Sequence, residues 1–303
     1  MLTVRTVKYP VRIDAAWGSL REREIINVRL DFPDGTYGEG EAAPLEPYDG
    51  VPAAAVRAAL DAYGQIQEPP ETLLDACRNE RDLPQALAAI DLALWDRHAR
   101  QSHTTIAKLI SPDALGAVPV NATIGAEDRA GAAKAAADAA RQGFTCVKVK
   151  VGIGDDAGRV AAVRAAAPDA LIRIDANGAW TTPREALANL RALAPIGIEL
   201  CEEPIHGAEN LAQVTQESPI PIACDETFAP ESVDVVCLKI ARGGITAVLH
   251  GAQEADDVYL ASTYDGPLGM RAAVHVAAGL KLTRHCGLAT GVLTVRDGFT
   301  PLS

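Results

Sequence analysis

The sequence predicts an α/β protein in which an N-terminal α+β capping domain precedes a modified TIM (β/α)7β barrel. Strand patterns open the chain and helical patterns follow them, which is typical of a small α+β domain. From about Val118, short apolar strands alternate with Ala-rich helical stretches, and this alternation indicates βα units around a parallel sheet. Repeated right-handed units of this number close most easily into a barrel, although periodicity alone leaves a doubly wound open sheet as the alternative.

The capping domain is expected to occupy residues 1–100. Its apolar alternation and its three- and four-residue apolar spacing predict two strand segments and then two helices, at 2–13, 24–45, 51–66 and 83–101. Asp34 and Gly35 lie between apolar runs of the second strand segment and are a hairpin signal. The C-terminal tail of the chain is expected to pack back on this domain.

The barrel is expected to occupy residues 115–290. Its strands are short apolar runs, at 118–124, 146–151, 171–177, 197–204, 220–226, 235–240 and 258–263. An eighth, weakly marked element lies near 285–290. No glycine-rich dinucleotide fingerprint follows any of these strands, which argues against an open nucleotide-binding sheet.

Composition restricts the partners that the protein can have. The chain has 303 residues, of which 48% are hydrophobic, and its formal net charge of -12 opposes binding to nucleic acid or to an anionic membrane.

No apolar run is long enough to span a bilayer and no signal peptide is apparent, so we expect a cytoplasmic location. None of the six cysteines has zinc-like spacing, and we expect buried free thiols. A small-molecule substrate is expected, and a homo-oligomer is left open.

Polar residues end five successive strands of the expected barrel. The active site of such a barrel lies at the carboxyl ends of its strands, so these side chains should converge. They are Lys148 and Lys150, Asp175 and Asn177, Glu202 and Glu203, Asp225 and Glu226, and Lys239. The carboxylates of Asp175, Glu202 and Asp225 lie about one βα unit apart, and three hard oxygen ligands from separate strands suit Mg²⁺.

The lysines suggest what this metal site does. Lys148 and Lys150 alternate with valines in one strand, so both side chains project to the same face. Two neighbouring ammonium groups repel each other, and we expect this repulsion to lower the pKa of at least one of them toward neutrality, where a lysine can act as a general base. Lys239 is expected to approach from across the barrel. This arrangement suits abstraction of a proton α to a metal-bound carboxylate, with Mg²⁺ neutralising the enediolate charge.

These motifs resemble the enolase superfamily and, within it, the muconate-lactonizing enzyme subgroup. The resemblance rests on K-x-K in VKVKVG, D-x-N in RIDANGAW, E-E-P in LCEEP, D-E in ACDET and the lysine of LKI. It extends to VRLDFPDGTYGEGEAAPL and IDLALWDRHAR, which look like the family's capping domain and its last helix. The mandelate-racemase branch uses a late His base, and no matching His-Asp arrangement appears here.

The resemblance implies roles for individual residues. Asp175, Glu202 and Asp225 would be the Mg²⁺ ligands, Lys150 the acid/base with Lys148 beside it, and Lys239 the lysine on the opposite face. Asn177 and Glu226 would be supporting residues, with Glu226 paired to Lys239. The family's specificity loops would supply residues that contact the rest of the substrate, namely Trp17, Tyr48, Ser262 and Asp265. One departure is that the stretch from Asp225 to Lys239 is too short for a full βα unit, so the fifth barrel helix is expected to be abbreviated or absent.

The subgroup performs several reactions that share this first step. We favour β-elimination of water by an o-succinylbenzoate synthase of menaquinone biosynthesis, because the chain is short for the family and RIDANGAW and HCGLATGVL look similar to such enzymes. The alternatives are an N-acylamino acid racemase or dipeptide epimerase, which uses a lysine on each face of the α-carbon, and a muconate-type cycloisomerase. A non-catalytic binding protein would lack a ligand or a lysine, and none is missing here.

Overall fold

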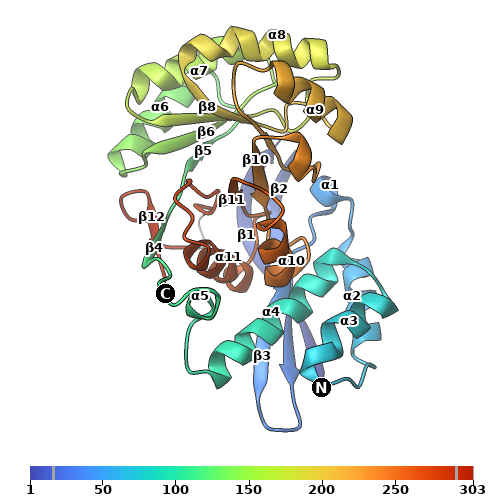
Figure 1. The fold of residues 1–303 in the computed structure, drawn as a ribbon. Coiled ribbons are helices and arrows are strands. Elements are labelled where there is room, and N and C mark those ends of the chain that lie inside the picture. Colours follow the sequence, from blue (N-terminus) through green and yellow to red (C-terminus); the bar gives the residue numbers. More distant parts are fainter. Residues whose placement is uncertain (16–17, 291–292, 303) are drawn as a thin grey trace.

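The computed structural model describes residues 1–15, 18–290 and 293–302 (Figure 1). Its N-terminal part is a three-stranded antiparallel sheet of β1 (Leu2–Ala15), β2 (Gly18–Asp31) and β3 (Tyr37–Ala42). The turn between β2 and β3 contains Gly35 at a φ of 79°, a left-handed conformation that favours glycine. The predicted hairpin at Asp34 and Gly35 is therefore confirmed.

Five helices follow this sheet, namely α1 (Glu46–Asp49), α2 (Ala53–Tyr63), α3 (Pro70–Glu80), α4 (Pro84–Gln101) and α5 (Ile106–Ile110). The two predicted helices correspond to α2 and α4. The helix α4 packs directly on β3, where a Cβ added at Gly40 would lie 2.1 Å from the carbonyl oxygen of Ala89. Gly40 thus allows the helix backbone to approach the sheet closely.

The second part is a seven-stranded parallel sheet in the order β11-β10-β9-β8-β7-β6-β5. Its strands are β5 (Ala122–Ile124), β6 (Cys146–Lys150), β7 (Leu171–Asp175), β8 (Ile198–Glu202), β9 (Ile222–Cys224), β10 (Val235–Leu238) and β11 (Val258–Leu260). Two residues connect the edges of this sheet. Cys286 N–H donates to the carbonyl of Pro119 at 2.8 Å, and Gly287 N–H donates to that of Leu260 at 2.8 Å. The sheet therefore curls into the predicted barrel, and the weak eighth element is confirmed as a backbone bridge.

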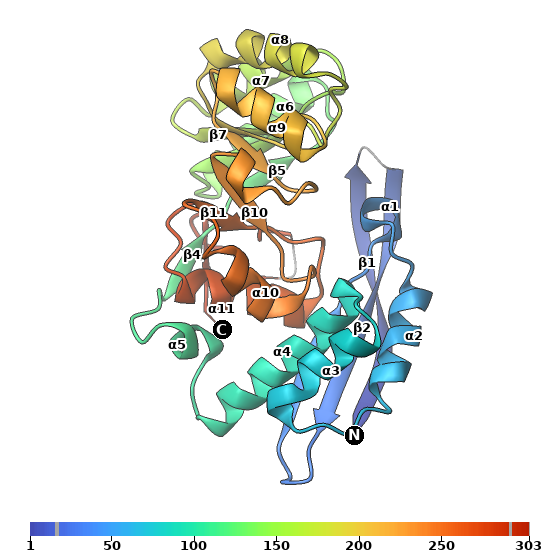
Figure 2. The same ribbon diagram turned by 45° about the vertical axis from the view of Figure 1, so that its right-hand side comes forward.

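The barrel helices lie outside the strands (Figures 1 and 2). They are α6 (Arg129–Arg141), α7 (Asp156–Ala166), α8 (Pro183–Leu193), α9 (Ala208–Glu217), α10 (Gly244–Gly251) and α11 (Pro267–Gly279), with a 3₁₀ turn, η1 (Ala194–Ile196), after α8. Between β9 and β10 the chain forms only the 3₁₀ turn η2 (Pro230–Ser232). The expectation of an abbreviated fifth helix is thus confirmed.

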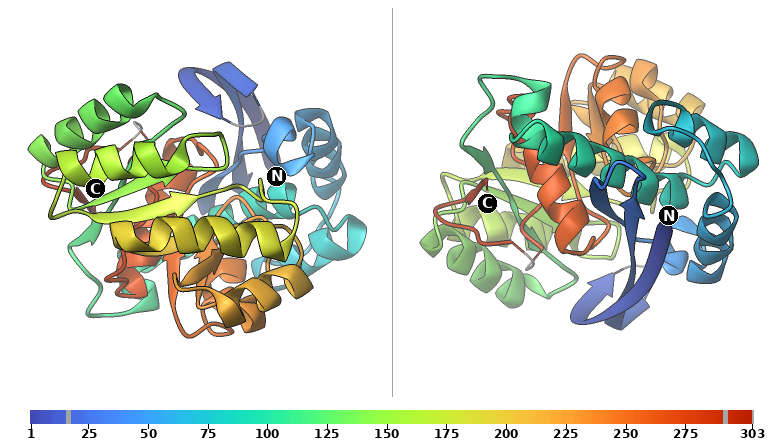
Figure 3. Two further views of the ribbon diagram at one scale, coloured as in Figure 1. Left: turned by 90° about the horizontal axis from the view of Figure 1, so that it is seen from above. Right: turned by 90° about the horizontal axis from the view of Figure 1, so that it is seen from below.

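The C-terminal tail does not follow the expectation. Its strand β12 (Phe299–Pro301) pairs antiparallel with β4 (Ala117–Pro119), which leads into the barrel. The C-terminus lies on the barrel side of the molecule and away from the N-terminus (Figures 1 and 3). The prediction that the tail packs on the capping domain is wrong, because the backbone groups of β4 offer it a hydrogen-bonding edge.

The described residues form two main hydrophobic cores. One joins the antiparallel sheet to α2, α3 and α4, and the other lies inside and around the barrel. Figure 2 shows the capping sheet on one side of the molecule and the barrel on the other. On this basis we propose a capping unit of residues 1–100 and a barrel of residues 115–290.

Buried polar side chains join the capping sheet to the loop after β11. The Arg23 guanidinium, which is 3% exposed, donates to the carbonyls of Ala43 at 2.6 Å and Tyr264 at 3.1 Å. The Glu41 carboxylate accepts hydrogen bonds from Gly266 N–H at 2.6 Å and Leu268 N–H at 2.9 Å, at the start of α11. Capping residues thus fix the backbone of a loop that reaches the barrel mouth.

Glu41 is expected to make stability depend on pH. Burial, together with the charge of nearby Asp265, raises the pKa of this carboxyl group to about 7. The folded protein therefore binds the Glu41 proton more tightly than the unfolded chain does, and this stabilisation is present below the unfolded pKa and lost as the pH rises toward 7. Denaturant unfolding from about pH 5 to about pH 8 should show a fall in unfolding free energy that is about 1 to 3 kcal/mol larger for the native protein than for Glu41→Gln. Equal slopes would contradict this assignment.

Two further expectations can be compared with the structure. All six cysteines are free and buried, as predicted. In the parts of the chain that the structure describes, no helix combines the length and the hydropathy that a bilayer crossing requires.

Candidate active site

The candidate active site is a pocket of about 420 Å³ at the carboxyl ends of the barrel strands. Its wall combines the strand-end lysines and acids with residues from the capping unit and from the loop after β11. Among its lining residues are Lys148, Lys150, Asp175, Asn177, Asp225, Lys239, Leu45, Tyr48, Ser262, Thr263 and Tyr264. The structure therefore brings most of the predicted site residues into one cavity.

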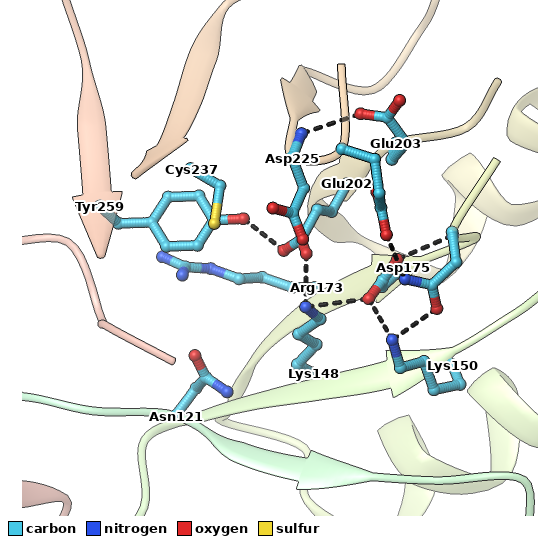
Figure 4. Close-up of polar contacts among 12 residues, drawn as sticks. Asn121, Lys148, Lys150, Arg173, Asp175, Glu202, Glu203, Asp225, Cys237 and Tyr259 are labelled. Carbon is cyan, nitrogen blue, oxygen red and sulfur yellow. Dashed lines mark hydrogen bonds and ion pairs between the residues drawn. The ribbon is translucent and has the colours of Figure 1, made fainter. Parts of the chain in front are cut away.

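Both lysines of β6 contact the acids of the neighbouring strands (Figure 4). Lys148 Nζ lies 2.6 Å from Glu202 Oε1 and 2.9 Å from Asp175 Oδ2, so a single ammonium group bridges two carboxylates. Lys150 Nζ lies 2.5 Å from Asp175 Oδ2 and 2.5 Å from Asn177 Oδ1. The parallel register of β6, β7 and β8, in which Lys150 pairs with Asp175 and Asp175 with Glu202, produces these contacts.

Lys239 approaches the acids from β10. Its Nζ donates to Asp225 Oδ1 at 2.5 Å, and its side chain is 4% exposed. The same carboxylate accepts a hydrogen bond from Tyr48 OH at 3.1 Å, and Arg242 Nη2 donates to that hydroxyl at 2.7 Å. A capping residue therefore contacts one of the predicted metal ligands directly.

Glu203, which follows β8, holds the chain that follows β9. Its carboxylate accepts hydrogen bonds from Asp225 N–H at 2.8 Å and from both the N–H and the hydroxyl of Thr227, at 3.1 Å and 2.5 Å. His206 Nδ1 lies 3.0 Å from the same carboxylate. Because these partners occupy its oxygens, Glu203 supports the loop that carries Asp225.

The pKa directions differ from one sequence-based expectation. Burial alone would lower the pKa of Lys148, but Asp175 and Glu202 outweigh burial and raise its pKa well above the ordinary value. Burial likewise opposes the charge of Lys239, and Asp225 raises its pKa. The predicted lowering of the lysine pKa is therefore wrong for Lys148. Its ammonium group lies 2.6 to 2.9 Å from two carboxylates, and their attraction favours the charged form.

The three acids show opposing effects of burial and charge. Burial raises the pKa of Asp175 and of Asp225, but the cations beside them reverse this effect and lower both values below the ordinary range. Burial raises the pKa of Glu202, the charge of Lys148 partly offsets this, and Asp175 and Asp225 add to the rise. Each of these carboxylates is at most 3% exposed, so the cluster concentrates negative charge where only a cation can balance it.

This donor set fits a hard divalent cation. Oxygens of Glu202 and Asp225 lie with Cys237 Sγ in a group whose atoms are all within 4.8 Å of one another. Burial raises the pKa of the Cys237 thiol well above its ordinary value, and the carboxylate oxygens are the hard donors of this group. Lysine ammonium groups lie 2.5 to 2.9 Å from Asp175, Glu202 and Asp225, so these oxygens are turned toward positive charge.

Glu226 has a different partner from the one expected. Its Oε1 accepts a hydrogen bond from Asn177 Nδ2 at 2.9 Å, whereas Lys239 pairs with Asp225. The expected Glu226–Lys239 pair is therefore wrong, because Lys239 pairs with Asp225 instead. Burial, together with the charges of Asp225 and Asp175, raises the pKa of Glu226 to about 7.

The predicted specificity residues divide into three groups. Tyr48 and Ser262 line the pocket. Asp265 instead is buried, accepts a hydrogen bond from Thr263 Oγ1 at 2.6 Å and is not among the residues that line the pocket, so its contact with substrate stays a prediction. Trp17 lies outside the described residues. Asp265 lies just before α11 and near Arg23 and Glu41 of the capping unit.

Sequence reasoning missed two residues that reach the site. Arg242 contacts Asp225 and Tyr48, and Tyr259 OH donates to Glu202 Oε2. Tyr259 alternates with apolar neighbours in VYLAST, so its inward direction agrees with the two-residue period of a strand. Nothing in the sequence pattern indicated its partner.

Two family models match the chain. Residues 1–111 match the N-terminal domain of mandelate racemase / muconate lactonizing enzyme, and residues 131–300 match the Enolase C-terminal domain-like model. The second model alone covers more than half of the chain.

Relatives of two activities are similar to this chain. It is 38% identical over 192 residues to the o-succinylbenzoate synthase of Thermobifida fusca (strain YX), a match that spans 57% of this chain and 59% of that protein. It is 27% identical over 304 residues to the hydrophobic dipeptide epimerase of Enterococcus faecalis (strain ATCC 700802 / V583), with 91% of this chain and 85% of that protein covered.

The fold is also that of solved structures. The dipeptide epimerase from Enterococcus faecalis V583, complexed with Mg and the dipeptide L-Leu-L-Tyr, superposes with a TM-score of 0.87 at 27% identity, over 100% of this chain and 96% of that chain. The L-Ala-D/L-Glu epimerase from Bacillus subtilis has a TM-score of 0.90 at 23% identity, with 100% of this chain and 96% of that chain covered, and shows the same fold. The chain spans about three fifths of the length of the o-succinylbenzoate synthases that it matches. It belongs to the mandelate racemase / muconate lactonizing enzyme family of the enolase superfamily.

Proposed function

We propose that this enzyme removes a proton α to the carboxylate of a small-molecule substrate in a Mg²⁺-dependent reaction. The observation that carries this proposal is a buried carboxylate cluster with lysines on two sides of the barrel. Lys150 ends β6 and Lys239 follows β10, and these two strands are four positions apart in the sheet order. In a closed ring of seven strands and a bridging eighth element, four positions separate opposite walls.

The proposed roles follow from these positions. Asp175, Glu202 and Asp225 hold the metal, and Lys150 takes the α-proton as general base. When bound there, Mg²⁺ would supply positive charge against the second negative charge of the substrate carboxylate as the enediolate develops. Lys148 and Lys239 add fixed positive charge on two sides of that carboxylate.

Supporting residues hold these groups in place. Asn177 accepts a hydrogen bond from Lys150 Nζ and donates to Glu226, which fixes the direction of the base. Tyr48 closes the pocket from the capping unit and excludes water from the reacting atoms. Tyr48 and Ser262 are proposed to contact the distal part of the substrate.

The reaction that we favour is β-elimination of water, as in an o-succinylbenzoate synthase. Its support is the 38% identity to such an enzyme, over 57% of this chain. In a syn elimination Lys150 takes the α-proton and then gives it to the departing hydroxyl group, so that water leaves and the electron pair of the broken C–H bond forms the new double bond.

The second candidate is 1,1-proton transfer by an epimerase. The observations that favour it are a lysine on each of two opposite walls and the similarity to a hydrophobic dipeptide epimerase over 91% of this chain. Lys150 would then serve one configuration of the substrate and Lys239 the other. A cytoplasmic location stays a prediction, as does the absence of nucleic-acid and membrane partners.

The Lys239→Ala variant separates these two functions. The enzyme is incubated in D₂O with Mg²⁺ and either the hydroxy-cyclohexadiene carboxylate substrate of the synthases or a panel of dipeptides and N-acylamino acids of both configurations. A synthase dehydrates the first substrate and need show no exchange with the amino acid derivatives. An epimerase exchanges the α-proton of both configurations, and Lys239→Ala retains exchange only for the configuration whose proton faces Lys150. Exchange by the native enzyme without dehydration would reject the synthase, and absence of both reactions would reject both candidates.

A further inference from the structure

A tyrosine inside the barrel contacts one of the proposed metal ligands. Tyr259, on β11, is 1% exposed, and its hydroxyl donates to Glu202 Oε2 on β8 (Figure 4). The other oxygen of the same carboxylate, Oε1, accepts the hydrogen bond of Lys148 at 2.6 Å. The two oxygens of Glu202 are therefore distinguished, because Oε2 faces a neutral donor and Oε1 faces a cation.

The ring of Tyr259 packs against the guanidinium group of Arg173. The Arg173 guanidinium carbon lies 4.8 Å from the ring centroid, and Arg173 is 1% exposed. Arg173 donates to Glu199 Oε2 at 2.7 Å and to the carbonyl of His285 at 2.5 Å, so its guanidinium has little freedom to turn. Contacts thus run without a break from the partly exposed Glu199 through buried Arg173 and Tyr259 to Glu202.

We propose that Tyr259 is a positioning residue that orients Glu202 so that Oε1 alone is presented to the divalent cation. A phenol hydroxyl buried in the barrel needs an acceptor, and Glu202 Oε2 is the acceptor it has. Removing the hydroxyl leaves that carboxylate oxygen buried without its donor and frees the carboxylate to rotate. Groups that orient a metal ligand in this way typically contribute 10- to 100-fold in metal affinity. This inference rests on the proposed Mg²⁺ site.

The test is metal binding to the Tyr259→Phe variant, measured by isothermal titration calorimetry with Mg²⁺ and with Mn²⁺. The substitution removes one oxygen and keeps the ring over Arg173. We expect the Kd to rise about tenfold or more for both ions. The matched control is Tyr63→Phe, because Tyr63 is also buried and its hydroxyl donates to a backbone carbonyl, that of Arg81, in the capping unit. The control should lower the melting temperature without changing the Kd.

The outcomes separate this inference from the proposed function. If the native protein binds neither ion, the proposed metal site fails. If the native protein binds the metal and Tyr259→Phe binds it with the same Kd, the metal site stands and the role of Tyr259 is wrong. Should Tyr259→Phe not fold, Arg173→Lys keeps the hydroxyl but loosens the ring, and we expect a smaller rise in Kd. An unchanged Kd in that variant would likewise overturn the inference.

Discussion

Replacing Lys150 by alanine is expected to lower kcat by about a thousandfold or more, whichever of the proposed reactions the enzyme catalyses. A positioned general base typically contributes a hundredfold to ten-thousandfold in rate, and Lys148, beside it on β6, is engaged by Glu202 and Asp175. The Lys150 side chain is 24% exposed, compared with 13% for Lys148 and 4% for Lys239, so it is the lysine most open to the pocket.

The control for this variant is Lys134→Ala. Lys134 lies on α6 with a side chain that is 77% exposed and pairs with Asp138 on the surface. We expect native rates from it, because it is far from the reacting atoms and its ion pair is solvated. A Lys150→Ala variant that keeps more than a tenth of the native kcat would show that another group removes the proton.

Replacing Asp225 by asparagine is expected to destabilise the protein and to abolish its stabilisation by Mg²⁺. Asp225 is the counter-charge of Lys239 and also contacts Arg242, and breaking a buried pair of this kind costs about 3 to 5 kcal/mol. The loss of one proposed ligand should also remove the rise in melting temperature that a cation produces by binding only the native state.

Calorimetric scans in EDTA and in millimolar Mg²⁺ measure both effects. The native protein should melt at a higher temperature in Mg²⁺, and Asp225→Asn should melt lower in both buffers with no difference between them. The surface variant Asp155→Asn loses the exposed pair with Arg129 and should keep the native response to Mg²⁺. A native protein whose melting temperature is the same in both buffers would remove the metal from the account.

Much of the barrel could be predicted because its strands are nearly all buried. Val147, Val149, Ile172 and Ile174 have no exposed surface, and runs of such residues stand out from the Ala-rich helices between them. The polar residues that interrupt these runs are exceptions to the apolar composition of the strands, so they indicate function directly. This is why Lys148, Lys150 and Asp175 could be brought together from the sequence alone.

The short elements could not be predicted because tertiary contacts stabilise them. The helix α3 begins with Pro69 and Pro70 and buries only Leu73 and Cys77, which is a weak apolar pattern. The strand β12 has three residues and depends on the edge of β4 for its hydrogen bonds. Neither property is visible in the sequence of the segment itself.

The other differences between the sequence-based predictions and the structure depend on distances between side chains of separate strands. The pKa of Lys148 depends on how closely Asp175 and Glu202 approach it, and chain spacing reports only that they share a rim. The contact of Tyr259 with Glu202 crosses the barrel interior between β11 and β8. Contacts of this kind depend on strand tilt and side-chain length, which an apolar period does not encode.

The most direct test of metal-assisted proton abstraction follows the C–H bond α to the substrate carboxylate. Native enzyme, native enzyme in EDTA, and Lys150→Ala are each incubated in D₂O with the cyclohexadiene carboxylate and with the dipeptide and N-acylamino acid panel, and the α-proton signal is recorded by NMR. We expect the native enzyme to remove the α-proton of at least one of these carboxylates in the presence of Mg²⁺, and EDTA to stop this loss. We expect Lys150→Ala to stop it for the cyclohexadiene carboxylate or, in an epimerase, for one of the two configurations. Loss of the α-proton at the native rate in EDTA, loss from the cyclohexadiene carboxylate or from both configurations at the native rate in Lys150→Ala, or a product that retains its original α-proton would contradict metal-assisted proton abstraction by Lys150.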